Sequence, residues 1–415
     1  MQKIKNCYDV VVVGGGPSGI AAAKRASTLG SKCLLIEQEA RLGGILNQCI
    51  HNGFGLKCFK EELTGPEYVS ALCKNLHSAN LDICLSSFVT EFGKKSLTLL
   101  TPDFCKTIRF KSAVIATGCR ERTAGMISLC GNRCSGIYTA GLAQKMINQF
   151  GKLPGKTAVI LGSGDIGLIM ARRLTLEGMK VKKIIEIKSS SSGLQRNIKQ
   201  CAEDFSIPIL FNHTVCEVVG KERVEGVFFS KVDENLVPIL SEKKFIKCDT
   251  LLLSVGLIPE IDFVKSLIEI NPKTSSAMVD ENRQSSASGI FFSGNCLHIH
   301  DLADNATSEG ELAGEAAHKF ASKKLNSKTH SHAILPGQNI GYVLPNIFYE
   351  NNQTIKIFFR SKEKLGKSTI VAKNKSGVFF TKNANAILPG ELQEISFEKT
   401  GLNSDIEISI QKREG

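Results

Sequence analysis

The chain has 415 residues, of which 42% are hydrophobic and 22% charged, and its formal net charge is +12. This length exceeds one ordinary core, and the balanced composition excludes a disordered or fibrous chain. The basic residues are scattered and Trp is absent, so we predict no nucleic-acid platform. No apolar run is long enough to span a membrane. The 14 cysteines include no CxxC pair, which excludes the commonest zinc and dithiol patterns and fits a reducing cytoplasm.

The first predicted unit is a strand over 8–13, a glycine turn, a helix over 18–29 and a strand over 32–36. The turn reads Gly14-Gly15-Gly16-Pro17-Ser18-Gly19. Gly14 allows the tight turn, Gly16 lets a pyrophosphate approach the backbone, and Gly19 lets the helix pack closely. The helix N-terminus offers free N–H groups to phosphates, and Glu37 at the second strand's end would bind ribose hydroxyls. The pattern predicts a dinucleotide site.

The same pattern recurs in the middle of the chain. A strand over 158–161 leads into Gly162-Ser163-Gly164-Asp165-Ile166-Gly167, a helix over 165–177 and a strand over 181–187 that contains Glu186. Two such sites in one chain indicate FAD plus NAD(P). The Glu186 carboxylate would repel a 2′-phosphate, which favours NAD over NADP. Lys188 and Arg196 are nearby cations that could reverse this preference.

Weaker signals complete the predicted cofactor sites. The motif Ala116-Thr117-Gly118 lies at the end of a predicted strand over 112–116, and Gly294-Asn295 follows a predicted strand over 289–293. A predicted helix over 302–320 comes next. The remaining residues assigned to FAD are Gln38, Arg41, Gly43, Gly44, Val89, Ala116, Thr117, Gly118, Gly294 and Asn295, and Gly256 after the strand over 251–255 is assigned to NAD.

The motif order predicts an α/β fold with two Rossmann-like dinucleotide-binding domains, the NAD domain being inserted in the FAD domain. We expect the FAD domain at 1–120 and 281–325 and the NAD(P) domain at 121–280. The pattern of residues 334–415 predicts a small C-terminal all-β, sandwich-like domain. Its predicted strands, in which apolar and polar residues alternate, are 355–360, 368–372, 377–380, 392–397 and 405–410.

These motifs, in this order, resemble the FAD/NAD(P)-dependent pyridine nucleotide oxidoreductase superfamily over about residues 8–325. The superfamily usually has Gly-Asp where this chain has Gly294-Asn295. The segments 43–55 and 297–302 resemble a bacterial group found alongside glycerol-3-phosphate dehydrogenases. That group is similar to the flavin subunits of hydrogen cyanide synthase, opine oxidase and sarcosine oxidase. The resemblance implies electron transfer with a partner dehydrogenase subunit or a small-molecule acceptor.

Catalytic side chains are less clearly marked. Cys49, His51 and His298 are the candidates, because all three lie beside cofactor motifs. Neither CxxC nor CxxxxC occurs, so a disulfide reductase is not predicted, and the spacing of Cys49 and Cys58 does not suit a redox pair. His298 could stabilise negative charge on a reduced flavin or be an ordinary hydrogen-bonded His. Its neighbours include further His and Asp residues, but no complete ligand set is present and no metal is predicted.

Together these patterns predict hydride transfer between NAD(P)H and FAD, with electrons passing to or from a partner dehydrogenase or a small acceptor and a link to glycerol-3-phosphate oxidation. Two alternatives stay open: a stand-alone NADH oxidase or reductase, and a non-catalytic FAD-binding assembly subunit. The oligomeric state does not follow from these motifs.

Overall fold

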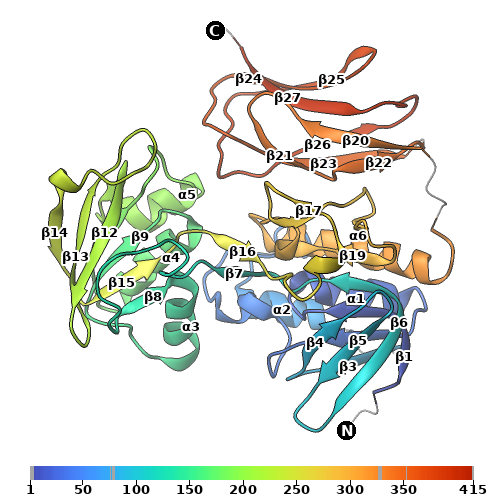
Figure 1. Ribbon diagram of the computed structural model, residues 1–415, viewed down its shortest axis with the longest axis horizontal. Coiled ribbons are helices and arrows are strands. Elements are labelled where there is room, and N and C mark those ends of the chain that lie inside the picture. Colours follow the sequence, from blue (N-terminus) through green and yellow to red (C-terminus); the bar gives the residue numbers. More distant parts are fainter. Residues whose placement is uncertain (1–3, 75, 77–79, 326–329, 352, 414–415) are drawn as a thin grey trace. The chain divides into compact units, whose positions relative to one another are not determined.

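The computed structural model describes residues 4–74, 76, 80–325, 330–351 and 353–413. The chain divides into two compact units, which we call unit 1 (Met1–Cys119 and Pro259–Gly415) and unit 2 (Arg120–Ile258) (Figure 1). Unit 2 is inserted in unit 1. The two crossings between them are the short paired strands β7 (Cys119–Glu121) and β16 (Leu257–Pro259).

Unit 1 contains a seven-stranded sheet in the order β3-β2-β1-β6-β5-β4, with β19 also paired to β6. Its strands are β1 (Cys7–Val13), β2 (Cys33–Ile36), β3 (Leu81–Cys84), β4 (Phe88–Phe92), β5 (Ser96–Leu100), β6 (Cys105–Ile115) and β19 (Ile290–Phe292). Strands β3, β2, β1, β6 and β19 are parallel, whereas β4 and β5 form an antiparallel extension. Strand β6 is longer than the predicted strand over 112–116, because its first half pairs with β5 and its second half with β19.

The parallel strands end in register at one edge of the sheet. Val13 lies opposite Ile36 and Ile115, and Ile115 lies opposite Phe292. The turns that follow these strands therefore start at a common edge, which is where ligands bind in open α/β sheets.

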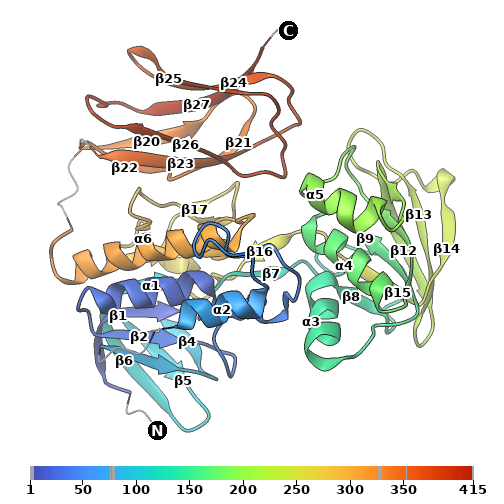
Figure 2. The same ribbon diagram turned by 180° about the vertical axis from the view of Figure 1, so that it is seen from behind.

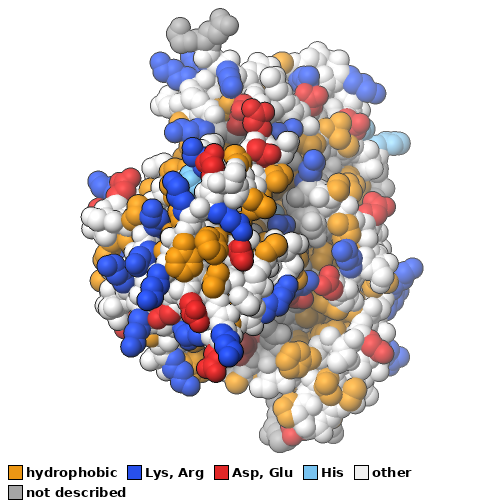
Figure 3. Space-filling model, turned by 60° about the vertical axis from the view of Figure 1, so that its left-hand side comes forward, with side chains coloured by type: hydrophobic (Ala, Val, Ile, Leu, Met, Phe, Trp, Pro, Cys, Tyr) orange, Lys and Arg blue, Asp and Glu red, His pale blue; other side chains and the backbone are white. Residues whose placement is uncertain are grey.

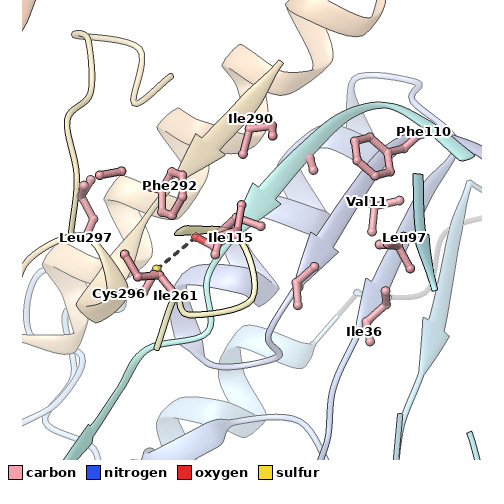
Figure 4. Close-up of a cluster of buried hydrophobic side chains, with 14 of the residues drawn as sticks. Val11, Ile36, Leu97, Phe110, Ile115, Ile261, Ile290, Phe292, Cys296 and Leu297 are labelled. Atoms are coloured by element: carbon pink, nitrogen blue, oxygen red, sulfur yellow. Dashed lines mark hydrogen bonds between the residues drawn. The ribbon is translucent and has the colours of Figure 1, made fainter. Parts of the chain in front are cut away.

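The core of unit 1 includes a segment that was predicted to belong to the nucleotide domain. Residues 259–280 lie in unit 1, whereas the sequence predicts that they belong to the NAD(P) domain. The physical reason is burial: Ile261 and Val264 pack in the same apolar cluster as β1 and β6. Figure 4 shows Ile261 in this cluster beside Cys296, whose Sγ donates a hydrogen bond to the Ile115 carbonyl oxygen at 3.2 Å. The segment carries the 3-10 helix η4 (Lys265–Leu267) and the strands β17 (Ile270–Asn271) and β18 (Ser276–Ala277).

Helix α6 (Ala303–Ala321) lies along α1 (Pro17–Thr28) in both Figure 1 and Figure 2, while α2 (Gly65–Cys73) follows the loop after β2. The two helices approach so closely that side chains are excluded. A Cβ on Gly310 would lie 2.1 Å from the Ser18 carbonyl oxygen, and one on Gly314 would lie 2.3 Å from that of Ala22. The small residues of the predicted helix over 302–320 therefore form its packing side.

Unit 2 contains a five-stranded parallel sheet in the order β11-β10-β9-β15-β8 and a three-stranded antiparallel sheet. Its elements are β8 (Ile137–Thr139), α3 (Ala140–Phe150), β9 (Thr157–Leu161), α4 (Asp165–Leu176), β10 (Lys180–Ile185), α5 (Gln195–Ile198), the π-helix η2 (Lys199–Glu203), β11 (Ile209–Leu210), β12 (His213–Gly220), β13 (Val224–Lys231), η3 (Leu240–Glu242), β14 (Lys244–Lys247) and β15 (Thr250–Leu253). Helix α3 was not predicted, because its first turn has no acidic residue and includes Gly141.

The C-terminal β domain consists of β20 to β27 and has its own apolar core. Its strands are β20 (Ser331–Pro336), β21 (Ile340–Leu344), β22 (Ile347–Tyr349), β23 (Thr354–Ser361), β24 (Ser368–Asn374), β25 (Gly377–Ala384), β26 (Gln393–Glu398) and β27 (Ile406–Lys412). They form a five-stranded sheet, β22-β20-β27-β24-β25, and a three-stranded sheet, β21-β23-β26. The observed architecture agrees with the predicted fold class.

The contact between α1 and α6 can be tested with Gly314→Ala. The added Cβ would meet the Ala22 backbone oxygen, and overpacking costs about 1–3 kcal/mol, which exceeds the roughly 1 kcal/mol that Ala gains in helix propensity. We expect urea unfolding, followed by circular dichroism, to show a lower free energy of unfolding. The control is Gly366→Ala, whose Cβ meets nothing within 4 Å. Equal stability of the two variants would contradict the close packing.

Candidate functional site

The first glycine turn is fixed by contacts that exclude a Cβ. Gly14 has φ +104°, and a Cβ there would lie 2.4 Å from the Ala116 carbonyl oxygen. A Cβ on Gly19 would lie 1.8 Å from the Gly14 carbonyl oxygen, whereas a Cβ on Gly16 would meet nothing within 4 Å. No side chain caps the N-terminus of α1. The open space at Gly16 and the uncapped N–H groups together fit a pyrophosphate.

The second glycine turn repeats this geometry in unit 2. A Cβ on Gly162 would lie 2.0 Å from the Ser254 carbonyl oxygen, and one on Gly167 would lie 2.6 Å from that of Gly162. At Gly164 the nearest atoms to a Cβ are hydroxyl oxygens at 3.7 Å. Asp165, the first residue of α4, accepts a hydrogen bond from the backbone N–H of Leu194 at 2.8 Å, so it organises the following loop. Ile166 is the next residue of the helix and packs at the edge of the unit 2 core.

The two predicted acids occupy equivalent places. Glu37 accepts hydrogen bonds from the backbone N–H groups of Gly15 and Glu39, both at 2.7 Å. Glu186 accepts them from Ser163 at 2.8 Å and Lys188 at 3.0 Å. Glu186 also accepts from the Ser163 hydroxyl at 2.5 Å. A carboxylate has about four acceptor sites, so each acid can still accept a ribose hydroxyl.

The loop after Glu37 approaches the first glycine turn. The backbone N–H of Gly43 donates to the Gly15 carbonyl oxygen at 2.7 Å, and a Cβ on Gly44 would lie 3.2 Å from the Gly16 Cα. Gln38 and Arg41 are exposed in this loop. Val89 lies in β4, two residues after Ser87, whose N–H donates to the Glu37 carbonyl oxygen at 3.0 Å.

In each unit, another glycine follows the strand that pairs with the strand before the glycine turn. Gly118 comes after β6 with φ +73°, and Gly256 comes after β15 with φ +105°. In unit 1 the Thr117 hydroxyl also donates to the Glu260 carbonyl oxygen at 2.5 Å, which holds the chain near the crossing. Both glycines therefore mark the edge of the sheet where the glycine turns lie.

The Gly294-Asn295 turn meets the start of α1. Gly294 has φ +74°, and a Cβ there would lie 2.8 Å from the Ser18 Cβ. The Ser18 hydroxyl donates to the Ser293 hydroxyl at 2.8 Å. Asn295 was predicted to bind the cofactor, and its Oδ1 accepts from the backbone N–H of His300 at 3.0 Å. Its amide nitrogen is the group that remains for a ligand.

His298 lies in a buried polar cluster directly after this turn. Its Nε2 lies 3.3 Å from a carboxylate oxygen of Glu309, and the Nε2 of His300 lies 2.9 Å from the other oxygen. Burial, and then the neighbouring His300, lower the pKa of His298 to about 4. His298 is therefore uncharged at neutral pH.

The other two catalytic candidates lie in the loop after Gly44. The Cys49 thiol donates to the Ile45 carbonyl oxygen at 3.3 Å, and burial raises its pKa to about 12. His51 has its Nδ1 2.9 Å from the Asn52 carbonyl oxygen and its ring centroid 5.0 Å from that of Phe54. A thiol with so high a pKa is a poor nucleophile, which disfavours redox chemistry at Cys49.

Sequence reasoning missed Glu309 and its partner Arg283. Glu309 is fully buried on α6 and bonds to Arg283 Nε at 2.8 Å. The only sequence signal was an acidic residue on the small-residue side of the predicted helix, next to Gly310.

The surface gives two broader observations. On the face shown in Figure 3, the Lys and Arg side chains drawn in colour are interspersed with acidic and apolar ones and form no continuous basic band. Among the residues that the structure describes, no helix is both long and apolar enough to cross a membrane.

Burial of neutral His298 predicts acid sensitivity. The folded-state pKa of about 4 lies below the ordinary value of 6.5, so the unfolded chain binds the proton first and stability falls as the pH drops from 6.5 towards 4. The groups facing the ring are His300, Glu309, Arg283 and Tyr342. We expect His298→Gln to reduce the loss of unfolding free energy between pH 6.5 and 4.5 by about 2 kcal/mol. The control is His330→Gln, a substitution of an exposed histidine. An equal loss of unfolding free energy over this pH range in His298→Gln and in the wild type would refute the role of His298.

Comparison with known proteins places these sites in a family. The family model for pyridine nucleotide-disulphide oxidoreductases matches residues 8–310. Thioredoxin reductase of Ureaplasma parvum is 24% identical over 325 residues, which cover 76% of this chain and 97% of that protein. Hydrogen cyanide synthase subunit HcnB of Pseudomonas protegens is 26% identical over 272 residues, which cover 60% of this chain and 56% of that protein. This chain therefore matches only about half the length of HcnB.

The fold has solved counterparts as well. The crystal structure of T. acidophilum thioredoxin reductase has a TM-score of 0.62 at 22% identity and covers 78% of this chain and 100% of that chain. At this identity the similarity establishes the fold alone. The residues that the family model matches include both glycine turns and the Gly294-Asn295 turn. The chain therefore belongs to the pyridine nucleotide-disulphide oxidoreductase family and is an FAD-dependent oxidoreductase that uses NAD(P)H.

Proposed function

We propose that the protein transfers a hydride between NAD(H) and FAD and exchanges electrons with a partner protein or a small acceptor, without a redox dithiol of its own. The observation that carries this proposal is the pair of equivalent glycine cradles, each closed by a buried acid, in a chain without CxxC or CxxxxC. The cofactors supply the hydride chemistry when bound, so the protein's task is to hold and orient them.

In unit 1, we assign the FAD pyrophosphate to the space over Gly16 and the N-terminus of α1. Glu37 is buried at the end of β2 and would accept the ribose hydroxyls. Asn295 would offer its amide N–H to the ribityl chain. Gly14 and Gly19 hold the turn in place, because a Cβ on either residue would collide with backbone.

In unit 2, Glu186 decides between the two nicotinamide dinucleotides. Its carboxylate would accept a free 2′-hydroxyl and repel a 2′-phosphate. The backbone N–H groups of Ser163 and Lys188 hold it at the end of β10. This arrangement supports NAD over NADP.

The cysteines favour an acceptor other than an internal disulfide. Burial raises the pKa of Cys49 to about 12 and that of Cys296 to about 11, so both thiols are protonated at neutral pH. The similarity to HcnB, which is named as a subunit, supports a partner protein. A link to a glycerol-3-phosphate dehydrogenase rests on the resemblance of segments 43–55 and 297–302, and co-purification of such an enzyme would support it.

The first test is anaerobic reduction. We expect the purified protein to be yellow or to become so with added FAD, and NADH to bleach the visible flavin band within one turnover in stopped flow. A protein that stays colourless with FAD would overturn the proposal. Rapid turnover with oxygen or a quinone and no partner would show the acceptor to be small, and FAD binding without reduction by NADH would indicate an assembly subunit.

The second test addresses nucleotide choice with Glu186→Gln. Loss of the carboxylate removes the repulsion of a 2′-phosphate and weakens binding of the ribose, so the ratio of kcat/KM for NADPH to that for NADH should rise at least tenfold, or about 1.4 kcal/mol. The control is Glu177→Gln, an exposed acid that pairs with Arg173 at 2.7 Å in the same unit. An unchanged ratio in Glu186→Gln would show that this carboxylate does not select NAD.

A further inference from the structure

Glu309 is a buried carboxylate with an unusual number of donors. One oxygen accepts from Arg283 Nε at 2.8 Å and from His298 Nε2 at 3.3 Å. The other accepts from His300 Nε2 and from the backbone N–H of Gly294, both at 2.9 Å. The Glu309 side chain is 2% exposed. Burial alone raises a carboxyl pKa, but these partners hold the pKa of Glu309 well below its usual range, so it stays ionised.

The protons of this cluster can be assigned. An ionised carboxylate only accepts hydrogen bonds, so both imidazoles carry a proton on Nε2, and in uncharged His298 the Nδ1 is an acceptor. The Nδ1 of His298 lies 3.5 Å from the Tyr342 hydroxyl, whereas the Nδ1 of His300 has no hydrogen-bond partner among the described residues. His298, His300 and Glu309 also lie close enough together to hold a metal. The Arg283 guanidinium already balances the carboxylate, which disfavours a second cation there.

The bond to Gly294 links this cluster to the predicted flavin turn. Gly294 begins η5 (Gly294–Cys296), and its N–H would lack a partner without Glu309. The turn cannot move toward α1, because Ser18 already fills the space that a Cβ on Gly294 would need. The next residue of α6, Gly310, also packs against this serine, because a Cβ there would lie 2.1 Å from the Ser18 carbonyl oxygen. Glu309 and Gly310 thus fix the turn relative to the start of α1.

The C-terminal β domain closes the cluster. Phe358 of β23 packs against His298 with ring centroids 5.5 Å apart, and its ring also lies 5.8 Å from the Arg283 guanidinium. Arg360 of β23 pairs with Asp301 and donates to the Ile299 carbonyl oxygen at 3.0 Å. The segment between the flavin turn and α6 is therefore held by the β domain on one side and by Glu309 on the other.

We propose that Glu309 is a positioning residue of the flavin site, which holds the Gly294-Asn295 turn in its binding geometry, and that the C-terminal β domain braces the same carboxylate through His298 and Tyr342. The inference rests on the proposed binding of FAD in unit 1. It gives the β domain a role in cofactor binding, although none of its residues belongs to a glycine turn.

The test compares Glu309→Gln with Glu315→Gln in the full chain. Glu315 lies on the same helix, but it pairs with Arg25 and Lys319 at the surface. Gln has one acceptor oxygen, so Glu309→Gln leaves donors without partners. We expect its Kd for FAD, measured by flavin fluorescence, to rise at least tenfold. At saturating FAD the visible circular dichroism of the bound flavin should also change, which a loss of global stability alone would not cause. Glu315→Gln should match the wild type in both measurements.

A second variant keeps the test decisive if Glu309→Gln does not fold. Tyr342→Phe removes only the hydroxyl beside His298, and we expect a twofold to fivefold rise in Kd with a changed visible spectrum. A folded Glu309→Gln with wild-type Kd and spectrum would overturn the inference, and so would an unaltered Tyr342→Phe if Glu309→Gln cannot be purified. Failure of the wild type itself to bind FAD would instead overturn the proposed function.

Discussion

No Cβ fits between Gly14 and the backbone that follows β6, and this steric constraint fixes the path of the chain from β1 into α1. Because Gly14 lies directly against the Ala116 carbonyl, β1 passes into α1 at the edge where the parallel strands end. The uncapped N-terminus of α1 is thereby fixed over that edge, where it can meet a phosphate. Gly162 and Ser254 reproduce the contact in unit 2. In both units, close contact between a glycine and a backbone carbonyl thus fixes the start of the helix that follows the glycine turn.

The close approach of α6 to α1 imposes a second condition. A helix that packs through Gly310 brings its neighbour Glu309 into the protein interior, where an ionised carboxylate costs several kcal/mol unless it is paired. Arg283 supplies the opposite charge, and the imidazoles and the Gly294 N–H supply the remaining hydrogen bonds. A polar cluster of this kind is stable only when all its members are present, so the β domain that covers it becomes part of the cofactor domain's architecture.

The features that follow from the sequence alone are those decided within one βαβ unit. The turn from Gly14 to Gly19 and the acid Glu37 depend on each other across a single helix, so their spacing carries the information. Glu309 could not be recognised in this way, since its partners come from distant segments that only the fold brings together. The place of residues 259–280 in unit 1 does not follow from the sequence for a similar reason, because nothing local marks Ile261 as part of the core of unit 1. In the β domain, the alternating strands from residue 354 on were predictable, whereas β20 ends at Pro336 and Pro345 separates β21 from the three-residue β22.

The insertion of unit 2 has a consequence for the order in which the molecule is made. Unit 2 is continuous in sequence, whereas unit 1 needs strand β19 and helix α6, which follow the whole of unit 2. During synthesis, β1 to β6 and α1 are therefore made before α6, the helix that packs against α1. Unit 2 can fold completely before the second segment of unit 1, which begins at Pro259, has been synthesised. The unit that begins the chain is thus completed only after the whole of unit 2 has been made.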